Sequence, residues 1–263
     1  MLFNFEKFNN QDFANFKNDL KNNGYIILRD VISLSFLKKL EREILSITWS
    51  HIKKAEINVI QNSRACALSS SHNLVEYSHS FEELYENNEI SMLFEKIIGT
   101  KPNSNLRINS SYFFKKKDSG SIKLHQDNAY FNLIDGTEAL TFYVPIHYQS
   151  RKIGTIYYYS GSHNLGFLNH VPKGNLGASM CLEEGENLKL LKKYKIDYLE
   201  LQPGDLVAHN ALVVHGTLPN PKDIPCEAFN FTLFSERNEI NDEGLLSYKK
   251  KLKKFLENCN NKI

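Results

Sequence analysis

The feature that most constrains the fold is a series of short β-prone segments between residues 105 and 236. Clusters of Gly, Pro, Asp, Asn and Ser separate these segments and predict tight turns between strands. Short strands at such close spacing favour an antiparallel sandwich or barrel of the jelly-roll type, mostly β with flanking helices. The expected strands span 106–114, 122–125, 140–146, 155–159, 198–201, 205–208 and 228–234.

The first 104 residues have a different pattern and are expected to be mainly helical. Phe13, Phe16 and Leu20 recur at helical spacing, and the pattern stops at Gly24, a residue type that commonly ends helices. The expected elements are a helix ending at 24, a strand at 25–28, a helix from about 33 to 44, a polar loop at 51–80 and a helix at 81–98.

The C-terminal part is expected to form one helix from 243 to about 258. Its lysines, Lys249 to Lys251 among them, alternate with leucines, and we interpret them as a solvated helix face rather than a nucleic-acid or membrane contact. Neither repeats nor a low-complexity linker are evident. We therefore expect one domain over 1–263, with 1–104 helical, 105–236 forming the jelly-roll core and 237–263 the C-terminal helix.

Composition excludes several classes of function. Lys and Arg number 32 against 30 Asp and Glu, so a net charge of +2 predicts neither a nucleic-acid nor a membrane partner. The N-terminus lacks a signal-peptide pattern, and no apolar run approaches the ~18–20 residues of a membrane span. The cysteines form no CxxC pair, which argues against a zinc knuckle and fits a reducing compartment. We therefore expect a cytoplasmic protein; the cysteines are Cys66, Cys181, Cys226 and Cys259.

The residues with the clearest chemical meaning are His125 and Asp127. Side chains alternate along an extended strand, so these two are expected to point to the same face. A histidine from a neighbouring strand, His215, would complete a triad of two imidazoles and one carboxylate. Such a triad binds iron(II) and leaves three adjacent positions for dioxygen and an organic ligand. A His-x-Asp pair is common in a chain with nine histidines, so the surrounding motifs decide its meaning.

Four motifs follow one another along the chain: a helix leading into Asn23-Gly-Tyr-Ile-Ile-Leu, then His125-Gln-Asp127, then Gly161-Ser-His163 after a strand, and last Pro203-Gly-Asp205 before His215-Gly-Thr-x-Pro-Asn220. With this ordered set, the sequence resembles the phytanoyl-CoA dioxygenase family of Fe(II)/2-oxoglutarate oxygenases. The resemblance covers roughly residues 10–235 and implies a double-stranded β-helix core, the cupin-like jelly roll.

The resemblance implies a non-heme iron dioxygenase that hydroxylates or otherwise oxidises a small molecule. His125, Asp127 and His215 would be the iron ligands. Thr217 would contact the tail of 2-oxoglutarate, and Tyr143 would form a wall of the cosubstrate pocket. An acidic residue at Asp127 favours hydroxylation over halogenation, since related halogenases have a small residue there. The substrate is expected to be a small polar metabolite or biosynthetic intermediate, with the segments 51–80 and 164–196 forming its lid.

One departure from the family concerns the cosubstrate. The family places an arginine eleven residues after the distal histidine, where it pairs with the distal carboxylate of 2-oxoglutarate; here that position is Cys226. Cysteine cannot supply the two-pronged charged contact of arginine. Either another cation replaces it, with Arg107 the first candidate and Lys123 the second, or the cosubstrate differs, or activity has been lost.

Two alternatives to the main hypothesis therefore remain. The first is a non-heme iron oxygenase with another cosubstrate or none. The second is a non-catalytic jelly-roll binding protein, in which the three metal-binding side chains would not converge. The sequence gives no oligomeric state.

Overall fold

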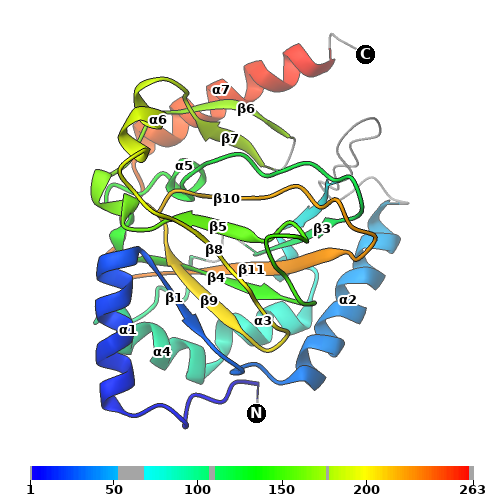
Figure 1. The fold of residues 1–263 in the computed structure, drawn as a ribbon, viewed down its shortest axis with the longest axis vertical. Coiled ribbons are helices and arrows are strands. Elements are labelled where there is room, and N and C mark those ends of the chain that lie inside the picture. Colours follow the sequence, from blue (N-terminus) through cyan, green and yellow to red (C-terminus); the bar gives the residue numbers. More distant parts are fainter. Residues whose placement is uncertain (1, 53–67, 107–109, 176–177, 261–263) are drawn as a thin grey trace.

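The computed structural model describes residues 2–52, 68–106, 110–175 and 178–260. Helices cover one side of a large sheet, and smaller sheets lie against its other side (Figure 1). The helices are α1 (Asn10–Asn23), α2 (Leu34–Ile52), α3 (His79–Glu86), α4 (Asn88–Ile98), α5 (Asn128–Phe131), α6 (Glu186–Leu191) and α7 (Asp242–Asn260). The strands are β1 (Tyr25–Leu28), β2 (Leu68–His72), β3 (Ser110–Lys115), β4 (Ala139–Pro145), β5 (Ile156–Tyr159), β6 (His170–Asn175), β7 (Ala178–Leu182), β8 (Ile196–Tyr198), β9 (Leu206–Asn210), β10 (His215–Thr217) and β11 (Cys226–Phe234).

The strands form a jelly roll. The major sheet is antiparallel with the order β1-β9-β4-β11-β3-β2, and the minor sheet has the order β10-β5-β8. Apolar side chains from both sheets meet between them, including Tyr143 of β4, Tyr158 of β5, Val207 of β9 and Ala228 of β11. The strands β6 and β7 form a separate hairpin. This arrangement agrees with the predicted class, mostly β with flanking helices.

The outer face of the major sheet packs against α2, α3 and α4. Alternate residues of β11 point to this side, so Phe229 and Phe231 meet Phe81 and Tyr85 of α3 at ring distances of 5.5 and 5.8 Å. The remaining residues of β11 face the interior of the jelly roll, because side chains alternate along a strand. One strand therefore contributes both to the core beneath the helices and to the core between the two sheets.

The helix α1 ends where the sequence predicts. Asn9 caps its first turn, and Gly24 ends it in the left-handed conformation, at φ +82°. A Cβ atom at Gly24 would also lie 2.7 Å from Nδ1 of His163. Only glycine combines that backbone conformation with so close an approach. The chain then continues directly into β1, which pairs with β9.

The structure corrects four local predictions. The segment 81–98 forms two helices, because Asn87 ends α3 and caps α4. The predicted loop 51–80 contains β2, a 3-10 turn and the start of α3, and its residues 53–67 lie outside the described residues. The predicted strand 122–125 is irregular and makes only an isolated bridge at His125. The segment 164–196 is not an open loop, since it contains β6, β7 and α6.

The C-terminal helix is confirmed as α7. None of the helices in the described part of the chain is long and apolar enough to cross a membrane.

Candidate metal and cosubstrate site

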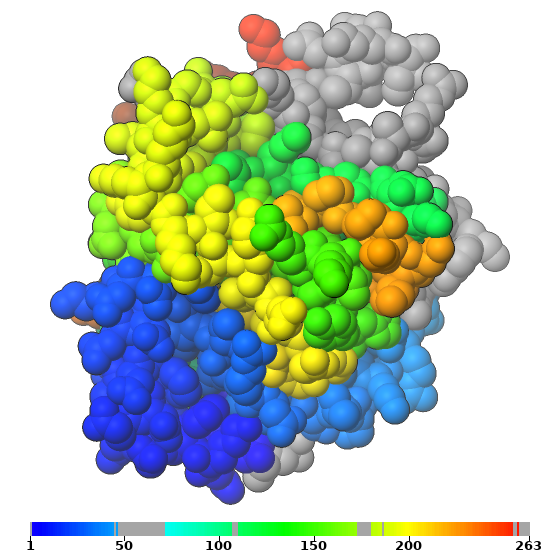
Figure 2. Space-filling model, in the orientation of Figure 1, coloured from blue at the N-terminus to red at the C-terminus, as the bar shows by residue number. Residues whose placement is uncertain are grey.

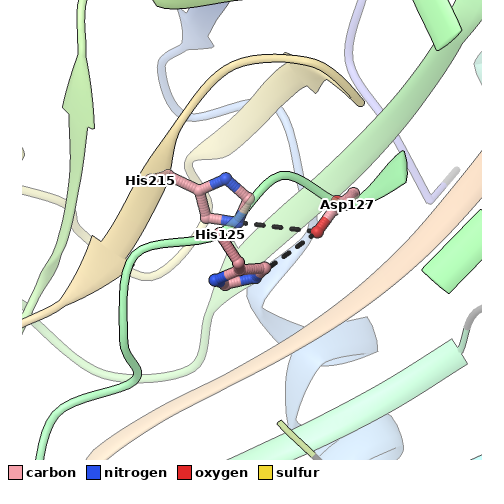
Figure 3. Close-up of side chains that lie close together, drawn as sticks. All are labelled: His125, Asp127 and His215. Carbon is pink, nitrogen blue, oxygen red and sulfur yellow. Dashed lines mark ion pairs between the residues drawn. The ribbon is translucent and has the colours of Figure 1, made fainter. Parts of the chain in front are cut away.

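The side chains of His125, Asp127 and His215 converge on one point inside the jelly roll (Figure 3). The Nε2 atoms of both histidines lie 3.6 Å from Oδ1 of Asp127. All three side chains are buried. Two nitrogens and one oxygen at these separations can bind one metal ion together, because metal bonds of about 2.0–2.2 Å place neighbouring ligand atoms about 3 to 3.6 Å apart.

Backbone carbonyls fix the orientation of both imidazoles. Nδ1 of His125 lies 2.8 Å from the carbonyl of Lys123, and Nδ1 of His215 lies 3.0 Å from the carbonyl of Val213. A carbonyl can only accept, so each Nδ1 carries the hydrogen and each Nε2 has a free lone pair. Burial holds the pKa of His215 well below its usual value, which keeps that ring neutral. Both histidines are thus in the tautomer that a metal requires.

Asp127 reaches the same point by a different route from the one predicted. Its backbone is helical, at φ −61° and ψ −30°, and it immediately precedes α5. Its side chain therefore meets His125 through a turn rather than along one face of a strand. The other carboxylate oxygen, Oδ2, accepts hydrogen bonds from Thr141 at 2.6 Å and from His209 at 3.0 Å. The pKa of Asp127 lies well below its usual value; burial raises it, but the surrounding histidines lower it by more.

His209 links the carboxylate to the centre of the minor sheet. Its second nitrogen, Nδ1, lies 3.0 Å from the hydroxyl of Tyr158, which is fully buried. Asp127 is thus held through Oδ2, and Oδ1 is left to face the two imidazoles. Asp127 was expected as a ligand, but nothing in the sequence pointed to Thr141 or Tyr158 as residues that hold it in place.

A further histidine supports the metal motif from the opposite side. Nε2 of His170, on β6, accepts a hydrogen bond from the backbone N–H of Gln126 at 3.0 Å. The side-chain amide of Gln126 also donates hydrogen bonds to the carbonyls of Gly166 and Leu212. These contacts fix Gln126 between the candidate ligands His125 and Asp127, and nothing in the sequence spacing pointed to His170.

The residues predicted to contact 2-oxoglutarate lie in different places. Thr217 is buried on β10, two residues after His215, and its hydroxyl accepts from the N–H of Ile122 at 3.0 Å. Tyr143 is buried on β4, and its hydroxyl donates to Gln149 at 2.8 Å. The side chain of Lys123 is exposed. Arg107 lies outside the described residues.

The structure brings an unpredicted cation to the position opposite Cys226. Lys115, the last residue of β3, is the cross-strand partner of Cys226 and is 3% exposed. Its Nζ donates to the carbonyl of Leu218 at 2.8 Å and to that of Gly154. Burial lowers its pKa to about 8. The sequence Lys115-Lys-Lys-Asp suggests a solvated turn, so only the strand pairing identifies this lysine as internal.

Three solved structures with a similar fold have low sequence identity to this chain. The non-heme alpha ketoglutarate dependent carbocyclase SnoK from nogalamycin biosynthesis has a TM-score of 0.70 and 15% identity, over 90% of this chain and 87% of that one. The epimerase SnoN, in complex with Fe3+, alpha ketoglutarate and nogalamycin RO, has a TM-score of 0.69 and 17% identity, over 89% and 87%. EctD from S. alaskensis, with 2-oxoglutarate and 5-hydroxyectoine, has a TM-score of 0.69 and 16% identity, over 87% and 78%. These likenesses confirm the predicted jelly-roll fold.

A comparison with curated protein sequences gave no match. The sequence profile of the phytanoyl-CoA dioxygenase family matches residues 20–223, well over half of the chain and including both histidines and the aspartate of the triad. Iron and 2-oxoglutarate are the cofactors of that family. The chain therefore belongs to the phytanoyl-CoA dioxygenase family of non-heme iron, 2-oxoglutarate-dependent oxygenases.

Proposed function

We propose that the protein is an Fe(II)- and 2-oxoglutarate-dependent dioxygenase that hydroxylates a small polar metabolite. The observation that carries the proposal is the convergence of two imidazole Nε2 atoms with one carboxylate oxygen at 3.6 Å, with both tautomers fixed by backbone carbonyls. Two histidines and one carboxylate are the ligands expected for iron(II) with open positions. His125, Asp127 and His215 are the proposed ligands.

Iron bound here would supply oxygen activation while the chain's own residues hold its ligands in place. Thr141 and His209 occupy Oδ2 of Asp127, so the carboxylate would bind through Oδ1 alone. A carboxylate that binds through one oxygen leaves more coordination positions of the metal open to other ligands. The second oxygen keeps its hydrogen bonds, so the carboxylate cannot rotate freely when ligands exchange.

Lys115 is the proposed partner of the distal carboxylate of 2-oxoglutarate. It lies directly across from Cys226, the position of the family's arginine, and it contacts the carbonyl of Leu218, three residues from His215. Three residues of chain span at most about 11 Å, so the cation is within reach of a short dicarboxylate bound at the metal. Lys115 replaces Arg107 and Lys123 as our first choice, because it is buried.

Buried polar atoms near this path fit a polar ligand. Among the described residues, Oγ1 of Thr155 and Oδ1 of Asn230 are buried without a hydrogen-bond partner. Thr155 adjoins Gly154, whose carbonyl accepts from Lys115, and Asn230 faces Tyr143 across the strand pair β11–β4. Buried polar groups are normally hydrogen-bonded. The hydroxyl of Thr155 can donate to a ligand carboxylate, whereas Oδ1 of Asn230 only accepts and suits a hydroxyl or N–H of a polar ligand. Thr217 and Tyr143 remain proposed walls of this pocket.

The segment 164–196 is the proposed wall of the substrate site. Its hairpin packs against the metal motif, since the N–H of Leu182 donates to Leu124 at 2.8 Å and Met180 bonds the hydroxyl of Tyr130 through both its N–H and its carbonyl. Tyr130 in turn contacts the ring of His125 at 5.9 Å. The hydroxyl of Tyr130 and the nearby Tyr248 of α7 make this region polar, which favours the proposal of a polar substrate.

We also propose that residues 1–263 act as one oxygenase domain in the cytoplasm. Cys226 lies outside any disulfide. Such a thiol is consistent with a reducing compartment.

The function is tested by succinate release from 2-oxoglutarate with purified protein, Fe²⁺ and dioxygen, with metabolite pools as substrate. Wild type should release succinate only when iron and oxygen are present, and Asp127→Ala should release none. The visible charge-transfer band that appears when 2-oxoglutarate chelates iron provides a second readout that does not need the substrate. Iron binding without this band and without succinate would instead support an oxygenase with another cosubstrate. If iron bound equally weakly to wild type and Asp127→Ala, the function would be wrong.

A further inference from the structure

A second group of metal-binding side chains lies on the outer face of the major sheet. It consists of Glu41 of α2, His147 of the segment after β4, and Glu227 of β11, and we call it the outer cluster. One ligand atom from each residue lies within 4.8 Å of the others. Glu227 adjoins Cys226 on β11, and neighbouring residues of a strand point to opposite faces. The sheet itself therefore separates the outer cluster from Cys226 and Lys115 on the inner face.

The central residue of the outer cluster is a buried carboxylate. The side chain of Glu227 is 7% exposed. Its Oε2 accepts a hydrogen bond from the hydroxyl of Tyr112 at 2.6 Å, whereas Oε1 faces the imidazole of His147. A buried carboxylate is costly unless a positive charge compensates it. The side chain of His147 is 39% exposed, so the cluster is open to solvent on that side.

The charges around His147 favour a metal ion over a shared proton. Nε2 of His147 lies 3.3 Å from Oε1 of Glu227 and 3.6 Å from Oε1 of Glu41. An unprotonated nitrogen would repel both oxygens, so either a proton or a cation must lie between them. A single proton on Nε2 pairs with one of the two oxygens and leaves the other carboxylate without a positive partner, whereas a metal ion serves both.

The same separations are those expected around a metal ion. Ligand bonds of about 2.0–2.2 Å at tetrahedral angles place ligand atoms about 3.3–3.6 Å apart. In the same chain, His125 and His215 each lie 3.6 Å from the carboxylate oxygen of Asp127. One imidazole with two carboxylates suits a divalent first-row transition ion, with water completing the coordination.

We propose that Glu41, His147 and Glu227 form a second metal site, which binds a divalent ion such as Zn²⁺ or Mn²⁺ and ties α2 to the outer face of the major sheet. The site lies outside the oxygenase centre, and it does not depend on the function proposed above. Its role is structural, because the ion joins a helix, a loop and a strand that are far apart in sequence.

The test uses a background in which the inner centre cannot bind metal. In His125→Gln/His215→Gln, equilibrium dialysis with elemental analysis should find one Zn²⁺ per chain, and zinc should raise the midpoint of thermal unfolding. Adding His147→Gln should abolish both effects. This variant should fold, because His147 is partly exposed and makes its closest contacts to the cluster itself; far-UV circular dichroism checks it.

A matched control is His79→Gln on α3. His79 also lies near two glutamates, at 3.4 Å from Glu82 and 3.9 Å from Glu83, but its side chain is 74% exposed. Zinc binding should be unchanged in this control. Zinc binding that survives His147→Gln, or that is absent from the background variant, would overturn the proposal. A loss of stability in His147→Gln that is the same with and without zinc would assign the cluster to a protonated imidazole and also overturn it.

Discussion

The two faces of β11 differ in the charge that they bury at its first two residues. On the inner face, Cys226 lies opposite Lys115, a buried cation that among the described residues contacts carbonyls and a thiol but no carboxylate. On the outer face, Glu227 is a buried anion held by the hydroxyl of Tyr112 and the imidazole of His147. The sheet separates the two residues, so Lys115 and Glu227 do not neutralise each other's charge.

This difference indicates what each face can bind. A buried charge without a countercharge destabilises the fold, so a ligand of opposite charge gains by pairing with it. The inner face should therefore attract an anion, and the outer face a cation. The chain segments around residues 150 (green) and 220 (orange) lie next to each other on the surface in Figure 2. A hydrogen bond joins them, since the N–H of Leu218 donates to the carbonyl of Thr155 at 3.0 Å.

The largest effect is expected from removing the inner cation. Lys115→Met should weaken 2-oxoglutarate binding by at least about 100-fold, since leaving a buried carboxylate unpaired costs about 3–5 kcal/mol. Iron binding should persist. Titration of the charge-transfer band of the iron complex with 2-oxoglutarate measures the effect.

A second substitution distinguishes loss of charge from loss of structure. Lys115→Met/Cys226→Arg restores a cation from the opposite strand and should recover most of the affinity. If Lys115→Met left the affinity unchanged, the inner face would not be the anion site.

The next effect concerns the pH dependence of stability. The pKa of Lys115 is about 8 in the folded protein, against about 10.4 for an unfolded lysine. Between these values the unfolded chain binds more protons, so this lysine makes the free energy of unfolding rise with pH, by about 3 kcal/mol in total. The facing thiol of Cys226, whose pKa burial raises, stays neutral at the start of this window.

Lys115→Met should therefore be more stable than wild type at pH 7, and the difference should shrink between pH 8 and 10.4. Urea unfolding at a series of pH values measures it. Saturating 2-oxoglutarate with iron should flatten the wild-type curve, because the bound carboxylate compensates the lysine. A constant difference across this range would show that Lys115 keeps an ordinary pKa.

A smaller effect is expected at the support of the inner metal ligands. His209→Phe removes one of two hydrogen bonds to Oδ2 of Asp127 and should weaken iron binding about 10- to 100-fold. Tyr158→Phe, which only removes the bond to His209, should have a lesser effect. Competition with a fluorescent chelator measures both. Equal affinities in all three proteins would mean that Thr141 alone holds the carboxylate.

The smallest effect is expected on the outer face. Tyr112→Phe leaves Oε2 of Glu227 without its donor and should lower the free energy of unfolding by about 1–3 kcal/mol, the cost of an unsatisfied buried acceptor. Adding Glu227→Gln should restore part of the loss, since an uncharged amide is less costly to bury. Chemical denaturation in the presence of a chelator separates this effect from metal binding.

The convergence of His125, Asp127 and His215 could be predicted from the sequence, because the three residues lie in motifs that can be read from the chain alone. The predicted geometry was nevertheless wrong in one respect, since Asp127 lies in a helical turn and not on a strand. The jelly-roll core was predictable for a similar local reason: β-branched and aromatic runs alternate with turn residues. The loop assignment was wrong for the described residues of 51–80 and 164–196, because polar strands such as β2 resemble loops when their pairing partner is unknown.

The buried charges could not be predicted, because both depend on pairing between distant segments. Lys115 begins a run of three lysines, and only its register with Cys226 turns it inward. In the sequence, Glu41 is separated from His147 and Glu227 by about a hundred residues or more, so no local pattern links the three. Long-range register decides the environment of such residues, and a single sequence does not contain it.

The isolated bridge between His125 and His215 has a consequence for how this scaffold can change. The two residues exchange both backbone hydrogen bonds, each at 3.0 Å, so the spacing of their rings is set by main-chain pairing before any ligand arrives. Insertions in the hairpin β6–β7 or in the chain after β4 need not alter this pair. The surrounding loops are thus free to diversify toward new substrates, and the amide hydrogens of the two histidines should exchange with solvent in a single shared opening event.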